Sequence, residues 1–209
     1  MSEIAARLSQ VICITSRRLV PGVMPAGEQG AEDWQPFLAR LERVAAARPR
    51  AIVLREKDLP AADYERLARA VLPLCRAQGV PCFLHSYPEL AIRLGADGLH
   101  MPLAALAALP EGERERIRCL GASCHSLADV RLAGTLGCSY VTLGHIYATS
   151  CKSGLPPRGR GLLRAVCAGT SLPVYAIGGI TPARLPEVLS DGAAGACVMS
   201  GLMRGTEWL

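Results

Sequence analysis

Short apolar runs alternate with longer amphipathic stretches along most of this 209-residue chain, and this alternation constrains its fold more than any other feature. Apolar residues recur at helical spacing in the longer stretches, as in Tyr64, Leu67, Val71 and Cys75. Short strands that are apolar on both faces are typical of parallel sheets covered by helices. Eight such strands predict an α/β fold, a single (β/α)8 TIM barrel, for which this length is near the lower limit.

The predicted elements can be placed by residue number. We expect the strands at Val11–Ile14, Ala51–Leu54, Pro81–Leu84, Gly98–Met101, Ile117–Ala122, Tyr140–Leu143, Pro173–Ile177 and Ala196–Met199. We expect helices at Asp33–Ala47, Ala61–Gln78, Ser126–Gly137, Gly161–Cys167 and Thr181–Leu189. A Rossmann-type sheet is the alternative, but no G-x-G-x-x-G follows the first strand.

Composition limits the class of protein. We find no linker, so residues 1–209 are expected to form one domain, and the N-terminus does not resemble a signal peptide. No apolar run approaches the roughly 20 residues of a membrane span.

The nine cysteines are odd in number and scattered, which favours reduced thiols and a cytoplasmic location. The net charge of +5 is dispersed, which favours a small anionic substrate over nucleic acid or membrane. Helices rich in alanine and leucine would also allow a homodimer.

Two glycine-bearing turns follow the last two predicted strands. Gly178-Gly179 comes after the seventh strand, and Ser200-Gly201 comes after the eighth. Glycine allows a sharp turn and a close approach of the backbone to a ligand, and helix N-termini leave N–H groups free to hold an anion. In a (β/α)8 barrel these two turns form the usual phosphate site, so we expect a phosphorylated ligand.

Charged and polar residues follow other predicted strands, where barrel active sites are built. Arg55 and Lys57 leave the second strand and suit an anionic substrate, although they could instead be surface charges balanced by neighbouring carboxylates. Lys152, in the predicted loop Thr149–Arg160, could reach a phosphate or a carboxylate. Ser123 ends the fifth strand, and we include it among the substrate-binding residues.

His125 is the candidate catalytic residue. It opens a predicted helix, whose positive end favours a neutral imidazole that can take up a proton, although it could be only a capping or loop histidine. The remaining histidines, His85, His100 and His145, also lie at strand ends and are weaker candidates. The histidines lack the spacing of a metal site, so we expect no metal and no cofactor. Cys151 could be a nucleophile, but sequence alone pairs no histidine with it.

Taken in order, these segments resemble the thiamine phosphate synthase/TenI superfamily. Each motif is weak alone, but the ordered set covers nearly the whole chain. The matching segments are Leu54–Lys57, Gly95–His100, Gly121–Ser126, Gly144–Lys152, Ala176–Ile180 and Val198–Gly201. The resemblance implies a (β/α)8 barrel that acts on a thiazole phosphate.

The superfamily has two enzymatic branches. Synthases join a pyrimidine diphosphate to the thiazole phosphate, and the resemblance implies Mg²⁺ held by acidic residues after strands three and four. Here His85 and Ser86 follow strand three, and the run Met101–Ala105 follows strand four. The thiazole tautomerase branch needs no metal and moves a proton between ring atoms, for which the resemblance offers His125.

We therefore predict a thiazole tautomerase, an isomerase of thiamine biosynthesis that aromatises a dihydrothiazole carboxylate phosphate. By the resemblance, the glycine turns hold the phosphate, and Arg55, Lys57 and Lys152 neutralise the carboxylate and the charge on the ring. The first alternative is a thiamine phosphate synthase, a transferase. The second is a non-catalytic protein that binds thiazole or thiamine phosphates.

Overall fold

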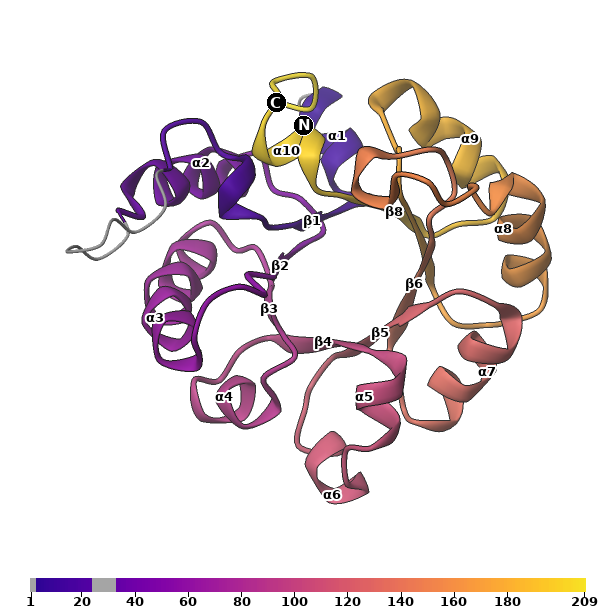
Figure 1. The fold of residues 1–209 in the computed structure, drawn as a ribbon, viewed down its shortest axis with the longest axis horizontal. Coiled ribbons are helices and arrows are strands. Elements are labelled where there is room, and N and C mark those ends of the chain that lie inside the picture. The colour runs from indigo at the N-terminus through magenta and orange to yellow at the C-terminus, as the bar shows by residue number, and fades with distance from the viewer. Residues whose placement is uncertain (1–2, 24–32) are drawn as a thin grey trace. The chain divides into compact units, whose positions relative to one another are not determined.

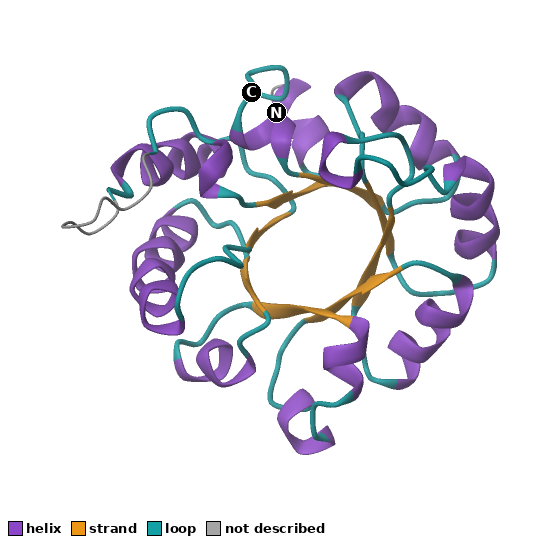
Figure 2. Ribbon diagram, in the orientation of Figure 1, coloured by secondary structure: helices purple, strands orange, loops and turns teal. Residues whose placement is uncertain are grey.

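The computed structural model describes residues 3–23 and 33–209. Its eight parallel strands pair in chain order as a closed barrel, which confirms the predicted (β/α)8 fold. Figure 2 distinguishes these strands from the helices that separate them along the chain. Part of the expected loop between Val20 and Gly30 lies outside the described residues.

The chain divides into two compact units, residues 1–82 with 199–209 and residues 83–198, and each is described by itself. The first unit contains the indigo and purple elements of Figure 1 and the yellow C-terminal segment. These elements are α1 (Glu3–Leu8), β1 (Val11–Ile14), η1 (Arg17–Leu19), α2 (Gln35–Ala46), β2 (Ala51–Leu54), α3 (Ala61–Ala77) and α10 (Ser200–Met203).

Buried apolar residues hold the first unit together. Every residue of β1 and β2 is buried, and the two strands pair in parallel with Cys13 opposite Ile52. The apolar stripe of α3 is buried as its spacing predicts, because residues three and four apart share one face of a helix. Tyr64, in this stripe, donates its hydroxyl to the Leu54 carbonyl at 2.6 Å, which ties the helix to the end of β2.

The C-terminal segment is tied to α2 through a buried arginine. Arg40 donates from Nε to the Leu202 carbonyl at 2.6 Å, and its guanidinium also contacts the Gly205 carbonyl. Trp208 is fully buried, and the Arg7 guanidinium lies 5.8 Å from the centre of its ring. The chain end is therefore part of the packed core of this unit.

The second unit carries the remaining strands, which are buried over most of their length. In register, His100 lies opposite Gly121 and Gly121 opposite Tyr140, so these three residues are neighbours across three strands. The strands are β3 (Cys82–His85, of which Cys82 belongs to the first unit), β4 (Gly98–Pro102), β5 (Leu120–Cys124), β6 (Tyr140–Gly144), β7 (Val174–Ile177) and β8 (Gly195–Val198).

The helical segments of the second unit include several short ones that the sequence pattern does not predict, because one or two turns are too few to show a period. None of the described helices has the length and apolar character needed to cross a membrane. The segments are α4 (Pro88–Arg93), α5 (Leu103–Ala107), α6 (Glu111–Arg114), α7 (Leu127–Thr135), η2 (Ser150–Lys152), α8 (Gly159–Ala168), η3 (Pro182–Arg184) and α9 (Leu185–Ser190).

Among the predicted boundaries that differ from the structure, two have an identifiable local reason. The fifth strand begins at Leu120 and not at Ile117, because the Ile117 N–H closes a turn onto the Arg114 carbonyl. The predicted helix Thr181–Leu189 is divided into η3 and α9. Pro186 lies at the start of α9, where its missing N–H is tolerated, and a helix running through it would lose a backbone hydrogen bond.

Candidate active site

The end of β2 is organised by a carboxylate that the sequence analysis treats only as a possible counter-charge. Glu56 is 3% exposed and accepts hydrogen bonds from the Thr15 hydroxyl at 2.6 Å and from the Arg17 backbone N–H at 3.0 Å. Burial raises the pKa of Glu56 above its ordinary value, and the bonds from Thr15 and Arg17 oppose that rise. Glu56 therefore joins the carboxyl ends of β1 and β2 within the first unit.

The two predicted substrate cations of this unit lie on either side of Glu56. Arg55 is half-buried and its backbone N–H donates to the Thr15 hydroxyl at 2.9 Å, whereas Lys57 is exposed. Arg17 forms ion pairs with both Glu56 and Asp58, and Arg18 forms one with Asp58.

His125 lies directly after β5 in the second unit and is exposed. Its Nδ1 is 2.9 Å from the Gly144 carbonyl, which can only accept, so Nδ1 carries the hydrogen and Nε2 of the neutral ring is an acceptor. The helix begins at Leu127, one residue after the predicted start at Ser126, so His125 lies outside it. Ser126 caps it by accepting from the Asp129 N–H at 3.1 Å, and the Asp129 carboxylate accepts from the His125 N–H at 2.7 Å.

The loop after β6 carries Lys152, which lies in η2 and is exposed. Two backbone hydrogen bonds close the base of this loop: Arg158 N–H to the His145 carbonyl at 2.9 Å and Gly159 N–H to the Ile146 carbonyl at 3.1 Å. Tyr147, just inside this base, donates its hydroxyl to Glu187 at 2.8 Å. The loop thus projects Lys152 from a fixed base.

Gly178 and Gly179 follow β7 with φ of +98° and +67°, values that favour glycine. A Cβ at Gly178 would lie 2.3 Å from His145 Cβ, and one at Gly179 would lie 2.5 Å from the Ala148 carbonyl oxygen. Both glycines are therefore needed for the turn to pack against the loop after β6, whether or not a phosphate binds there. Arg184 steadies the turn by donating to the Gly179 carbonyl at 2.7 Å.

The second glycine turn belongs to the first unit. Ser200 is exposed at the start of α10, and a Cβ at Gly201 would lie 2.7 Å from Nε1 of Trp208. The close approach of the Trp208 ring thus accounts for the glycine at this position.

Ser123 is part of a hydrogen-bonded chain inside the second unit. His100 contacts the Ser123 hydroxyl through Nε2 at 2.9 Å and the Tyr140 hydroxyl through Nδ1 at 3.0 Å. His100 and Tyr140 are buried, and Ser123 is half-buried. Tyr140 was not among the predicted site residues, because it begins a largely apolar strand and its sequence context is that of a core residue. Its hydroxyl group, within a mostly apolar strand, was the only sequence feature that could have indicated a polar role.

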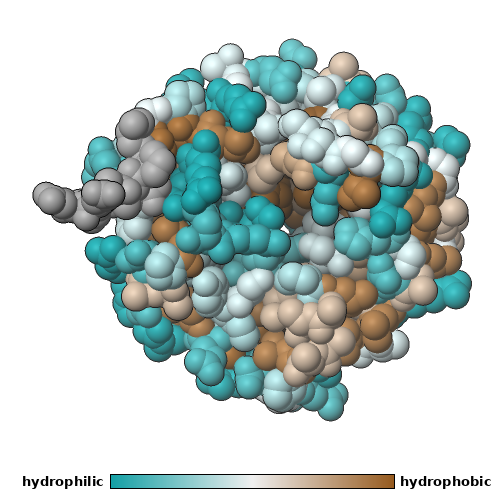
Figure 3. Space-filling model, viewed as in Figure 1, coloured by the Kyte–Doolittle hydropathy of each residue, from teal (hydrophilic) through white to brown (hydrophobic). Residues whose placement is uncertain are grey.

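The residues at and just after the ends of β3 and β4 do not fit the Mg²⁺ that the resemblance to synthases implies. Magnesium prefers oxygen ligands, usually carboxylates. His85 and Ser86 instead hydrogen-bond each other at 2.8 Å, and the segment after β4 exposes Ala104 and Ala105. Figure 3 shows apolar surface in the region of α5. Nowhere in residues 3–23 and 33–209 do three or more His, Cys, Asp or Glu side chains gather as a metal site.

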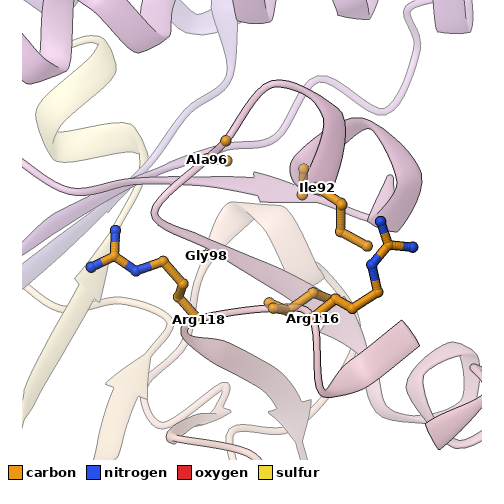
Figure 4. Close-up of a pocket in the computed structure, with 8 residues that line it drawn as sticks. Ile92, Ala96, Gly98, Arg116 and Arg118 are labelled. Atoms are coloured by element: carbon orange, nitrogen blue, oxygen red, sulfur yellow. The ribbon is translucent and has the colours of Figure 1, made fainter. Parts of the chain in front are cut away.

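A small hollow of about 100 Å³ lies at the amino ends of β4 and β5, the opposite strand ends from those that carry Ser123 and His125. Its lining includes Ile92, Gly98, Arg116 and Arg118. In Figure 4 the two guanidinium groups point away from each other. Because they do not converge, this hollow is a poor site for an anion.

Comparisons to known proteins agree with the fold. The family model for thiamine monophosphate synthase matches residues 24–202, and the chain belongs to that family. The thiamine-phosphate synthase of Moorella thermoacetica is 33% identical over 177 residues, which is 81% of each chain. That of Roseiflexus castenholzii is 36% identical over 158 residues, 73% of this chain and 68% of the relative.

A solved structure supports the fold alone. The thiamine phosphate pyrophosphorylase from Pyrococcus furiosus superposes with a TM-score of 0.75 and covers 97% of this chain and 92% of its own. Its sequence is 24% identical to this one, which is too low to carry an activity across.

The prediction of a thiazole tautomerase, an isomerase, is wrong by these comparisons. The relatives that match over two thirds or more of their length are named as synthases, which are transferases. The prediction gave great weight to His125 and to the residues that replace two acidic positions. His125 is an exposed residue next to a helix cap, and such a position does not by itself define proton-transfer chemistry.

Proposed function

We propose that this protein is a thiamine-phosphate synthase, the first alternative that the sequence left open. The reaction breaks the bond between the pyrimidine-bearing carbon and its diphosphate oxygen. It forms a bond from that carbon to the thiazole ring and releases pyrophosphate. The observation that carries this proposal is the similarity, over most of both chains, to relatives that are named for this activity.

The residues proposed to bind substrate suit two phosphorylated partners. In the first unit, Arg55 and Lys57 supply positive charge, and Ser200 and Gly201 supply a turn for a phosphate. In the second unit, Lys152 supplies charge, and Gly178 with Gly179 supplies the other turn. Guanidinium and ammonium groups stabilise both the bound diphosphate and the charge that develops on pyrophosphate as it leaves.

Ser123 and His125 complete the proposed site in the second unit. Ser123 offers a hydroxyl to an anionic oxygen. When the ring of His125 is neutral and Nδ1 donates to the Gly144 carbonyl, Nε2 can accept a hydrogen bond from a bound ligand. No step is assigned to a metal ion, because the residues after β3 and β4 do not fit one.

The test is to incubate the protein with the pyrimidine diphosphate and the thiazole phosphate, and to measure thiamine phosphate and pyrophosphate. Parallel reactions with added Mg²⁺ and with a chelator show whether the activity depends on a metal. We expect both products in equal amounts. Absence of both products, when a related synthase is active under the same conditions, rejects the proposal.

A second candidate is a binding protein that retains the phosphate turns without the reaction. The replacement of acidic positions by His85 and Ser86 and by Met101–Ala105 favours it. This candidate predicts calorimetric binding of thiazole phosphate or thiamine phosphate with no product from either substrate pair. Formation of product by the wild-type protein at a rate above that of a Lys152→Ala variant would reject this binding-protein candidate.

We also propose that residues 1–209 act as one domain, since the family match extends through both compact units. A cytoplasmic location is supported by the nine cysteines, all of which are free thiols in the structure.

A further inference from the structure

Three side chains on neighbouring strands of the second unit form a continuous chain of hydrogen bonds. Tyr140 starts β6, His100 lies in β4, and Ser123 lies near the end of β5. The oxygen–nitrogen distances are 3.0 Å from Tyr140 to Nδ1 of His100 and 2.9 Å from Nε2 to Ser123. Distances of this size are ordinary for hydrogen bonds, so each ring nitrogen has one partner in the chain.

Gly121 makes this chain possible. It lies between His100 and Tyr140 in the strand register, and a Cβ there would lie 2.2 Å from Cζ and 2.6 Å from the hydroxyl oxygen of Tyr140. A side chain at position 121 would therefore push the phenol away from the imidazole. The strand leaves space for the phenol to reach His100.

The direction of the hydrogen bonds follows from the burial of Tyr140. Its side chain is packed against the rings of Phe83 and Tyr175, each 5.8 Å away between ring centres. Among the described residues, Nδ1 of His100 is the one acceptor within reach of its hydroxyl. Burial also raises the pKa of Tyr140 well above its ordinary value, so the phenol stays protonated at neutral pH.

A buried hydroxyl without an acceptor is costly, so the phenol donates to Nδ1 and Nδ1 carries no hydrogen. The hydrogen of the neutral imidazole is then on Nε2, which donates to the Ser123 oxygen. The opposite tautomer would place two hydrogens between Tyr140 and His100, or leave the phenol hydrogen without a partner.

We infer that Tyr140, acting through His100, holds Ser123 as a hydrogen-bond donor toward an anionic ligand. Because the Ser123 oxygen already accepts from Nε2, its own hydrogen is directed away from the imidazole. Ser123 is the half-buried end of the chain, where a ligand can meet it. A phosphate or diphosphate oxygen, which can only accept, matches such a donor.

Tyr140 and His100 are positioning residues in this scheme, and Ser123 makes the contact. The identity of the anion rests on the proposed function, but the tautomer of His100 does not. The two can therefore be tested separately.

The first measurement is the ¹⁵N spectrum of His100 in the wild-type protein at neutral pH, which distinguishes a bare ring nitrogen from a protonated one. We expect a bare Nδ1 and a protonated Nε2. In Tyr140→Phe and in Gly121→Ala, which removes or displaces the hydroxyl, this preference should weaken. A wild-type protein with hydrogen on Nδ1 and none on Nε2 overturns the inference, and no variant needs to fold for that result.

The second measurement is calorimetric binding of inorganic pyrophosphate in metal-free buffer. Loss of one donor to a charged oxygen predicts a roughly tenfold weaker Kd in Ser123→Ala. Tyr140→Phe leaves the donor present but unaligned, so we expect about a threefold loss. Phe83→Leu is the matched control, because it changes the packing against the Tyr140 ring and leaves the hydroxyl in place. Its Kd should equal that of the wild type.

The inference is wrong if pyrophosphate does not bind to the wild type, if Ser123→Ala binds it equally well, or if Tyr140→Phe and Phe83→Leu have the same effect. Thermal unfolding of each variant shows that the comparison is between folded proteins. Failure to form thiamine phosphate would reject the proposed function and leave both of these measurements valid.

Discussion

Gly178 lies so close to His145 that a Cβ on the glycine would come within 2.3 Å of the histidine Cβ. The two residues directly follow neighbouring strands, and Tyr147 N–H donates to the Gly178 carbonyl at 3.0 Å beside this contact. The turn after β7 and the loop after β6 are thus packed backbone to backbone. Any side chain at position 178 has to separate them.

We therefore expect Gly178→Ala to destabilise the protein by about 3 kcal/mol, from the sum of a clash and a positive φ. Gly137→Ala is the control, since Gly137 has φ of +83° but an added Cβ there would have nothing within 4 Å. The control should cost only about 1 kcal/mol. Denaturant unfolding measures both, and equal losses would show that the contact with His145 is unimportant.

Glu56 predicts a decrease in stability with rising pH. Because burial raises its pKa in the folded state, the folded protein holds this proton at pH values where the unfolded chain has lost it. The protonated Glu56 side chain therefore contributes to the free energy of unfolding. This contribution is fully present below about pH 4.5 and is lost as the pH rises through the folded-state pKa. Glu56→Gln should remove this part of the pH dependence of the unfolding free energy. Glu111→Gln is the control, because Glu111 is exposed, and this variant should show the same pH dependence as the wild type.

Asp191 is expected to have the opposite effect, so that the free energy of unfolding rises with increasing pH. It is 6% exposed, and the hydrogen bond from Arg160, with Nε at 2.5 Å, lowers its pKa below the ordinary 3.8. Its stabilisation is therefore present above about pH 3.8 and is lost as the pH falls through the folded-state pKa.

In Asp191→Asn, the free energy of unfolding should fall less steeply as the pH decreases into the acid range. Asp63→Asn is the comparison, because Asp63 forms only a surface pair with Arg66, and such pairs contribute about 1 kcal/mol or less. An acid limb that is unchanged in Asp191→Asn would contradict the assignment.

We expect an alkylating reagent to react with one cysteine before the others. Cys151 is the one exposed thiol of the nine, whereas burial raises the pKa of Cys124 to about 12 and that of Cys138 to about 11. Since the thiolate is the reactive form, iodoacetamide at pH 8 should modify Cys151 first. Peptide mass spectrometry after brief labelling checks this, and Cys151→Ser should remove the fast phase. Equally fast labelling of Cys124 would show that the β5 end opens readily.

The strands were largely predictable because each is a local run of buried apolar residues between polar turns. β1 and β2 have the predicted bounds, and each of the other strands differs from its predicted bounds by one to three residues at one or both ends. The polar contacts were not predictable in this way. Arg17 and Glu56 are 39 positions apart, and His100 and Tyr140 are 40 apart, so only the closed sheet brings them together.

The activity was harder to predict than the fold, because it depended on a few positions after β3, β4 and β5. Replacement of acidic residues and the presence of His125 favoured a metal-free isomerase. Similarity to synthases over most of the chain contradicts that choice. Lys152 and the glycine turns do not distinguish the two reactions, since both act on a phosphorylated thiazole.

The two backbone hydrogen bonds at the base of the loop after β6 have a consequence for protein engineering. They join His145 to Arg158 and Ile146 to Gly159, so both ends of the intervening segment are fixed next to each other. A segment closed in this way can be replaced by one of another length at a small entropic cost, without altering the strand that carries it. Residues 149–157 could then be exchanged between relatives as one segment on an unchanged barrel.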